Sequence, residues 1–181
     1  MNRVLLLLAA VSFAACDTMA PVAADPDGPI LPVAEGNTWT YRADDGRALT
    51  LAVGPAVDVE GERYHRLLVT LDGETSNDDE YVRAIGRGAE LLYTAPLASG
   101  ALYREATVYR YPVEGGRYEA EGRTYDVDRE AVDVPAGAFE AVTYAGYDGD
   151  PDVSAALAPG VGIVRFHDGQ ATWSLERVAL R

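Results

Sequence analysis

The chain has 181 residues and a formal net charge of −14, and all 15 of its basic residues are arginine. Because no basic run offsets the excess of acidic side chains, the composition argues against nucleic-acid binding and against strong attraction to anionic lipid headgroups. The single cysteine, Cys16, leaves no disulfide possible within the chain.

Residues 1–15 predict an export signal. Arg3 precedes a run, 4–15, that is apolar apart from Ser12. A membrane-spanning helix needs about 20 apolar residues, so this run is too short to cross a bilayer. Its length is typical of the apolar region of a secretory signal peptide.

The stretch FAAC, 13–16, resembles the lipobox of bacterial lipoprotein signal peptides, although Phe13 stands where leucine is usual. The resemblance implies cleavage before Cys16, diacylation of its thiol, acylation of the new amino group and attachment to a membrane of the cell envelope. The alternative is ordinary secretion, with Cys16 left as a free thiol. Asp17 is associated with inner-membrane retention in enterobacterial lipoproteins only, so the choice between inner and outer membrane stays open.

After the lipidated Cys16, the segment through residue 31 is rich in Pro, Ala and Asp and carries no apolar period. We expect 16–31 to be a flexible tether. The remaining residues, 32–181, are long enough for one ordinary domain with its own hydrophobic core.

From residue 32 onward the pattern is that of β-strands. Short alternating runs flank tight turns such as Asp45-Gly46, Gly86-Arg87-Gly88, Glu121-Gly122 and Asp168-Gly169, which predict hairpins. A polar, acidic loop is expected over 72–80. The one helix candidate is 150–157, where Asp150 would cap and Pro151 would occupy the first helical position. The prediction is an all-β domain: a single curved antiparallel sheet, half-barrel-like, with at most one or two short helices.

Two stretches near the C-terminus carry the most distinctive pattern: VDVPAGAFEAVTY (132–144) and APGVGIVRF (158–166). With GNTWTY (36–41), they resemble a family of uncharacterised bacterial envelope lipoproteins with the pattern V-x-V-P-A-G-x-F … A-P-G-V-G-x-V. That family is similar to the lipoprotein-carrier half-barrels, so the resemblance implies a curved sheet with one concave apolar face. It implies no catalytic residue.

The candidates for metal or catalytic chemistry are few. His65 and His167 lie on separate predicted strands, and a zinc site needs three or four ligands. Alternate carboxylates at Asp148, Asp150 and Asp152 could bind calcium, but the glycine and glutamate of an EF-hand loop are missing, which favours a solvated loop. Without a nucleophile beside a base or a phosphate-binding loop, we expect no enzyme, no metal and no cofactor.

Two functions remain after these exclusions. One is a non-enzymatic accessory or structural lipoprotein whose interior is filled by its own side chains. The other is a carrier or binding module that holds an apolar ligand (a lipid or acyl chain) or a protein segment on the concave face. The eleven tyrosines fit either function, because tyrosine is a good strand residue and can also line a ligand site.

Overall fold

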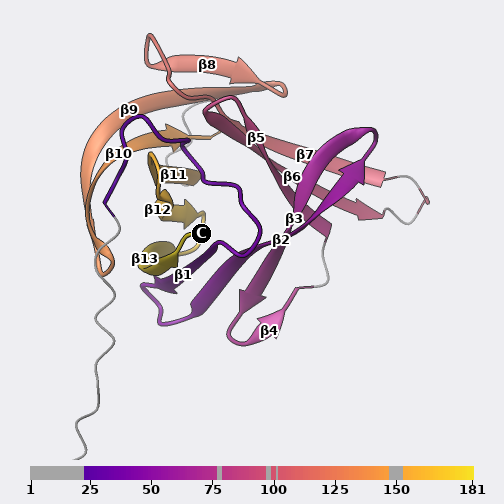
Figure 1. Ribbon diagram of the computed structural model, residues 1–181, viewed down its shortest axis with the longest axis horizontal. Coiled ribbons are helices and arrows are strands. Elements are labelled where there is room, and N and C mark those ends of the chain that lie inside the picture. Colours follow the sequence, from indigo (N-terminus) through magenta and orange to yellow (C-terminus); the bar gives the residue numbers. More distant parts are fainter. Residues whose placement is uncertain (1–22, 77–78, 97–98, 101, 147–152) are drawn as a thin grey trace, which may run out of the picture.

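A computed structural model describes residues 23–76, 79–96, 99–100, 102–146 and 153–181 (Figure 1). Within these ranges the chain forms thirteen strands that belong to one antiparallel sheet. The strands are β1 (Thr38–Ala43), β2 (Ala48–Val59), β3 (Glu62–Leu71), β4 (Glu74–Thr75), β5 (Asp79–Ile85), β6 (Gly88–Pro96), β7 (Leu102–Tyr109), β8 (Arg117–Ala120), β9 (Arg123–Val134), β10 (Gly137–Ala145), β11 (Val153–Ala158), β12 (Gly162–Asp168) and β13 (Thr172–Ala179).

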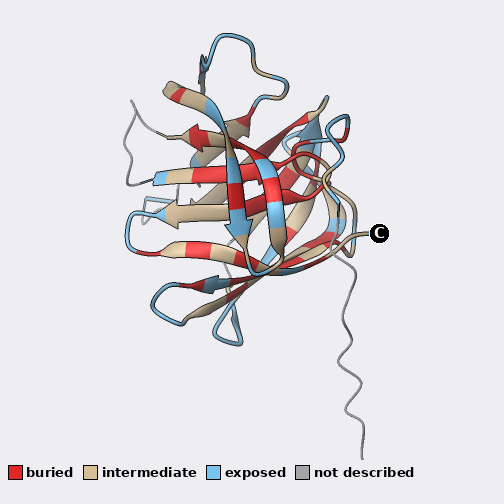
Figure 2. Ribbon diagram, turned by 90° about the vertical axis from the view of Figure 1, so that its left-hand side faces the viewer, coloured by how far each residue is buried: buried red, intermediate tan, exposed pale blue. Residues whose placement is uncertain are grey.

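The sheet follows the order β7-β6-β5-β3-β2-β1-β13-β12-β11-β10-β9-β8, with the short β4 paired to β3. It curls into a nearly closed barrel, which confirms the predicted all-β class and continues the expected half-barrel curvature further round (Figure 1). The last strand, β13, pairs with the first, β1, and so joins the two halves of the chain. Buried residues lie along the strands, and exposed residues are frequent at the turns (Figure 2).

The predicted hairpins are present. Asp45-Gly46 lies between β1 and β2, Gly86-Arg87 joins β5 to β6, Glu121-Gly122 joins β8 to β9, and Asp168-Gly169 lies at the turn between β12 and β13. Gly46 has φ +95° and Gly122 has φ +72°, conformations that glycine adopts without the strain of a Cβ. Local turn chemistry therefore sets these four strand pairs.

The prediction of a helix over 150–157 is wrong for those of its residues that the structure describes. Residues 153–158 form β11, which pairs with β10 on one edge and β12 on the other. Ala155 through Ala158 are all buried, so no alternation of apolar and polar residues marks the segment as a strand. Pairing on both edges outweighs the high intrinsic helix propensity of alanine and leucine, because that propensity is worth less than about 1 kcal/mol per residue.

The acidic loop expected over 72–80 is shorter than predicted. Glu74 and Thr75 form β4, and Asp79 and Glu80 already belong to β5. The strand β7 ends at Tyr109, and the chain then turns through the cis Tyr111–Pro112 peptide.

The two edges of the barrel, β7 and β8, meet through side chains instead of a backbone ladder. The Tyr118 hydroxyl on β8 donates to the Val108 carbonyl oxygen at 2.5 Å, and it accepts from the Arg110 amide at 3.3 Å. On β9, Arg123 donates to the Ala106 carbonyl oxygen at 3.3 Å. These contacts satisfy carbonyl groups that an open strand edge would expose.

Residues 24–31, expected to belong to the flexible tether, pack against the barrel. The Ile30 amide donates to the Arg87 carbonyl oxygen at 2.7 Å, and the Asp25 amide donates to that of Pro159 at 2.9 Å. Ile30 is fully buried and Leu31 is 6% exposed. This segment, the strap, crosses one end of the barrel (indigo in Figure 1). Two apolar residues at the end of a polar run are enough to fix it, because burial stabilises each.

Replacing Ile30 with alanine tests the strap. The truncation removes buried methyl groups at the closed end, so we expect the free energy of unfolding to fall by about 2–4 kcal/mol in urea denaturation. Asp27→Ala, on an exposed strap residue, is the matched control and should leave the stability nearly unchanged. Equal stabilities for the two variants would show that the strap does not pack in solution.

Candidate functional site

A cavity of about 340 Å³ lies inside the barrel. Its wall is mostly apolar, and the apolar part is built by inward-facing residues from both halves of the sheet: Leu49, Leu51, Leu67, Val69, Leu91, Ala155, Ile163 and Phe166. Leu49 and Leu51 illustrate how the sequence produces this wall, because alternate residues of a strand share one face. Ligand sites in proteins typically measure about 300–1,000 Å³ and are mostly apolar, so this cavity has the size and character of one.

The strap closes the opposite half of the interior. There Leu31, Trp39 and Ile163 leave a void of only about 10 Å³. The Trp39 indole donates its Nε1 proton to the Val161 carbonyl oxygen at 2.6 Å, and a Cβ on Gly162 would stand 3.0 Å from that nitrogen. The barrel is therefore solid at the strap end and hollow at the other.

Four tyrosines gather between the cavity and the seam of β7 with β8. Tyr118 stacks on Tyr125 with ring centroids 4.9 Å apart, and Tyr109 meets Tyr144 edge-on at 5.0 Å. Burial raises the pKa of Tyr109, and the neighbouring Tyr125 and Tyr118 raise it further. Burial is likewise the main cause of the raised pKa of Tyr144. Tyr109 and Tyr144 are thus neutral phenols at physiological pH.

The Tyr125 hydroxyl differs from the hydroxyls of the neighbouring tyrosines in its hydrogen bonding. The residue is 2% exposed, and no hydrogen-bond partner for its hydroxyl exists among the described residues. By contrast, the Tyr144 hydroxyl donates to the Arg110 carbonyl oxygen at 2.8 Å. A buried polar group without a partner costs about 1–3 kcal/mol, so such groups in native proteins call for a physical or functional reason.

The wall also carries ionisable residues: Glu80, Arg123, His167 and Asp168. The Arg123 side chain forms an ion pair with Glu105 and reaches the Thr107 hydroxyl at 3.4 Å. The Gly169 amide donates to Nδ1 of His167 at 3.1 Å. These residues come from strand ends at the hollow end of the barrel, away from the strap.

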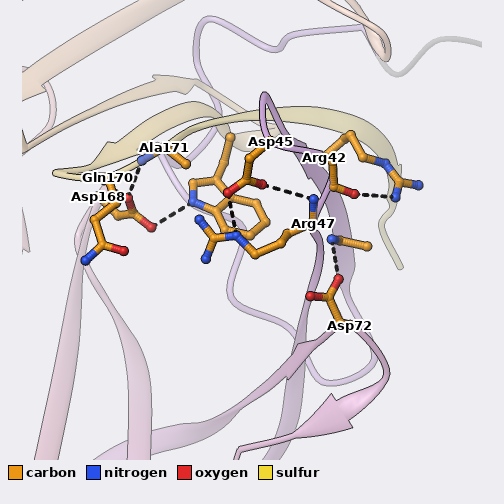
Figure 3. A network of polar contacts seen from close by, with 10 residues as sticks. Arg42, Asp45, Arg47, Asp72, Asp168, Gln170 and Ala171 are labelled. Atoms are coloured by element: carbon orange, nitrogen blue, oxygen red, sulfur yellow. Dashed lines mark hydrogen bonds and ion pairs between the residues drawn. The ribbon is translucent and has the colours of Figure 1, made fainter.

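Aspartates build the turns at this end (Figure 3). Asp168 accepts hydrogen bonds from the Trp173 indole at 2.9 Å and from the Ala171 amide at 2.8 Å. Arg47 lies over the Trp173 ring, 5.0 Å from its centroid. Partial burial raises the pKa of Asp168, but the hydrogen bonds from Trp173, Ala171 and Gln170 outweigh burial and hold that pKa below its ordinary value near 3.8. The rim is thus fixed by charge-assisted hydrogen bonds.

The sequence-predicted candidates do not form a joint site. His65 lies on β3 with Nδ1 3.0 Å from the Gly54 carbonyl oxygen, whereas His167 lies at the cavity. Cys16 and the aspartates 148, 150 and 152 fall outside the described residues. Among the residues that are described, no three His, Cys, Asp or Glu side chains are grouped to hold a metal ion. The sequence does not identify Tyr125 as a site residue. It lies in an alternating run like those of the other predicted strands, and no local motif distinguishes it from the other tyrosines.

The described part of the chain holds no helix long and apolar enough to cross a membrane.

No family model and no curated protein matches the chain. Among solved structures, it is similar to a protein from Bacteroides fragilis, described as exported and having a YmcC-like fold: the TM-score is 0.51, identity is 18%, and the match covers 83% of this chain and 98% of that one. A protein from Parabacteroides distasonis, described as a lipoprotein, matches with a TM-score of 0.45 and 13% identity over 84% of this chain and 99% of that one. The first likeness shows that the chain has a YmcC-like fold.

Tyr118→Phe tests the seam. The substitution keeps the stacked ring but removes the hydroxyl that joins β8 to the end of β7, so we expect a loss of about 1–2 kcal/mol in the free energy of unfolding. Hydrogen exchange at the Arg110 amide should also become faster. Unchanged exchange at this amide would show that Tyr118 does not hold the edges together.

Asp168→Asn tests the rim. A carboxylate whose pKa is lowered by folding stabilises the folded state above its unfolded pKa of about 3.9 and loses that contribution as the pH falls through the folded pKa. We therefore expect wild type to exceed the variant in stability most at pH 7, and the difference to shrink below about pH 4. Urea unfolding at several pH values measures it. The exposed Asp133→Asn is the control, and a pH-independent difference would contradict the assignment.

Proposed function

We propose that this protein is a bacterial envelope lipoprotein, anchored by lipid on Cys16, that binds an apolar ligand inside its barrel. The signal-like residues 1–15 and the FAAC stretch support export and lipidation. The shared fold with a protein described as exported is consistent with that location. The proposed role includes no enzymatic step. The lipid anchor is compatible with either the inner or the outer membrane.

The single observation that carries the binding role is the cavity. A purely structural domain gains stability by filling its interior, since each buried methylene contributes about 0.8 kcal/mol. Here the strap end follows this rule, whereas about 340 Å³ at the other end is lined mostly by apolar side chains and is left unfilled by the residues that the structure describes. The contrast favours ligand binding over the accessory role that a packed interior would indicate.

The occupant can be identified by native mass spectrometry. Residues 17–181, which are the mature chain without the lipid-bearing Cys16, are exported behind a cleavable signal sequence, so that the domain folds in its own compartment without an anchor and keeps the whole strap. We expect a bound mass of a few hundred daltons or less that is released on denaturation. A clean protein mass, together with no uptake of the neutral fluorescent probe N-phenyl-1-naphthylamine, would contradict the binding role.

Filling the cavity should abolish binding. Ala155→Phe puts a ring into the apolar wall, and we expect at least a tenfold loss of affinity for N-phenyl-1-naphthylamine without loss of the folded state. Ala131→Phe, on an exposed position of β9, is the matched control and should bind as wild type does. Val69→Phe repeats the test from β3 if the first variant unfolds. Unchanged binding by a folded cavity variant would place the probe elsewhere.

A further inference from the structure

We propose that the ligand is an uncharged amphiphile: an apolar chain of about a dozen carbon atoms with one oxygen that accepts a hydrogen bond from the Tyr125 hydroxyl. This inference rests on the proposed binding role and names the chemical class that the same cavity takes.

Tyr125 is held rigidly with its hydroxyl buried. Its ring is stacked on Tyr118 with an interplanar angle of 11°, and Tyr118 is itself fixed by its hydrogen bond to Val108. Tyr125 is one of the residues that line the cavity, and its buried hydroxyl has no hydrogen-bond partner in the described part of the chain. A preorganised donor of this kind binds an oxygen acceptor at little cost in conformational entropy.

The cavity volume sets the size of the apolar part. An apolar cavity of about 150 Å³ accommodates a six-carbon ring such as benzene. In proportion, a cavity of about 340 Å³ accommodates about a dozen carbon atoms. The apolar lining would bury such a chain, and the few polar groups would fix its orientation.

The charges around the cavity argue against an anionic headgroup. Glu80 and Asp168 are carboxylates, and the Arg123 guanidinium is already paired with Glu105. The chain as a whole carries a formal net charge of −14. A ligand carboxylate would therefore enter a negative field without an unengaged cation among these residues. An ester, ketone or similar neutral oxygen meets no such penalty.

Three probes of equal carbon number test this inference: 2-undecanone, undecane and undecanoic acid. The affinity of each is measured by its displacement of N-phenyl-1-naphthylamine from the protein of residues 17–181. In wild type at pH 8 and low salt, the ketone should bind at least tenfold more tightly than the acid. Tyr125→Phe should weaken ketone binding about fivefold, the worth of one hydrogen bond, and leave undecane binding unchanged.

The outcomes separate the inference from the proposed function. If no probe displaces the dye and the dye itself does not bind, the binding role fails. If all probes bind but Tyr125→Phe changes none of their affinities, the binding role stands and the Tyr125 donor is wrong. If the acid binds more tightly than the ketone, the uncharged headgroup is wrong.

A second readout needs no ligand. Because the Tyr125 hydroxyl is buried without a partner, Tyr125→Phe should unfold at a higher urea concentration than wild type. Tyr41→Phe is the matched control: Tyr41 is also a buried strand tyrosine but lies outside the cavity lining, and its hydroxyl bonds to the Ile163 carbonyl oxygen. This variant should unfold at a lower urea concentration than wild type and retain the wild-type affinity for the ketone. Destabilisation by Tyr125→Phe would show that the hydroxyl has a partner in the free protein and would overturn the inference.

Discussion

The contact between Trp39 and the chain at Val161 and Gly162 is the point on which the rest of the barrel depends. The indole ring lies against a residue that has no side chain, and a Cβ on Gly162 would come within 2.8 Å of Leu31 as well. Only glycine therefore lets β12, the indole and the strap meet. Because this end is packed solid, the free space of the interior is confined to the other end.

Closing the barrel through side chains has a second consequence. A backbone ladder between β7 and β8 would bring the two strands to about 4.8 Å and leave little room inside the barrel beside them. Tyr118 and Arg123 span the same edge with longer groups. The seam can therefore be satisfied while β9 presents Tyr125 to the cavity. The polar residues that close the sheet and the polar residue that faces the cavity belong to one hairpin.

Much of the fold could be predicted from the sequence because its hairpins are local. An Asp-Gly or Gly-x-Gly turn between two alternating runs specifies its own strand pair, as between β1 and β2. The pairing of β1 with β13 could not be predicted in this way, since it joins residues at opposite ends of the domain. The sequence of β11 predicts a helix, because burial of consecutive residues removes the alternation by which a strand is recognised. Ile30 falls within the predicted tether, because two apolar residues give no period.

From the sequence, a ligand cavity could be predicted only as one of two alternatives. Residues that pack a core and residues that line a cavity are of the same types, and they differ only in whether a neighbour fills the space beside them. Tyr125 and Tyr41 both look like inward-facing strand tyrosines. The Tyr41 hydroxyl donates to the Ile163 carbonyl oxygen at 3.0 Å, whereas no described residue bonds to that of Tyr125. That difference arises only when distant strands come together. Tyrosine at position 125 is less favourable for folding than phenylalanine would be, unless its hydroxyl donates a hydrogen bond to some acceptor. A ligand oxygen in the adjoining cavity would be such an acceptor.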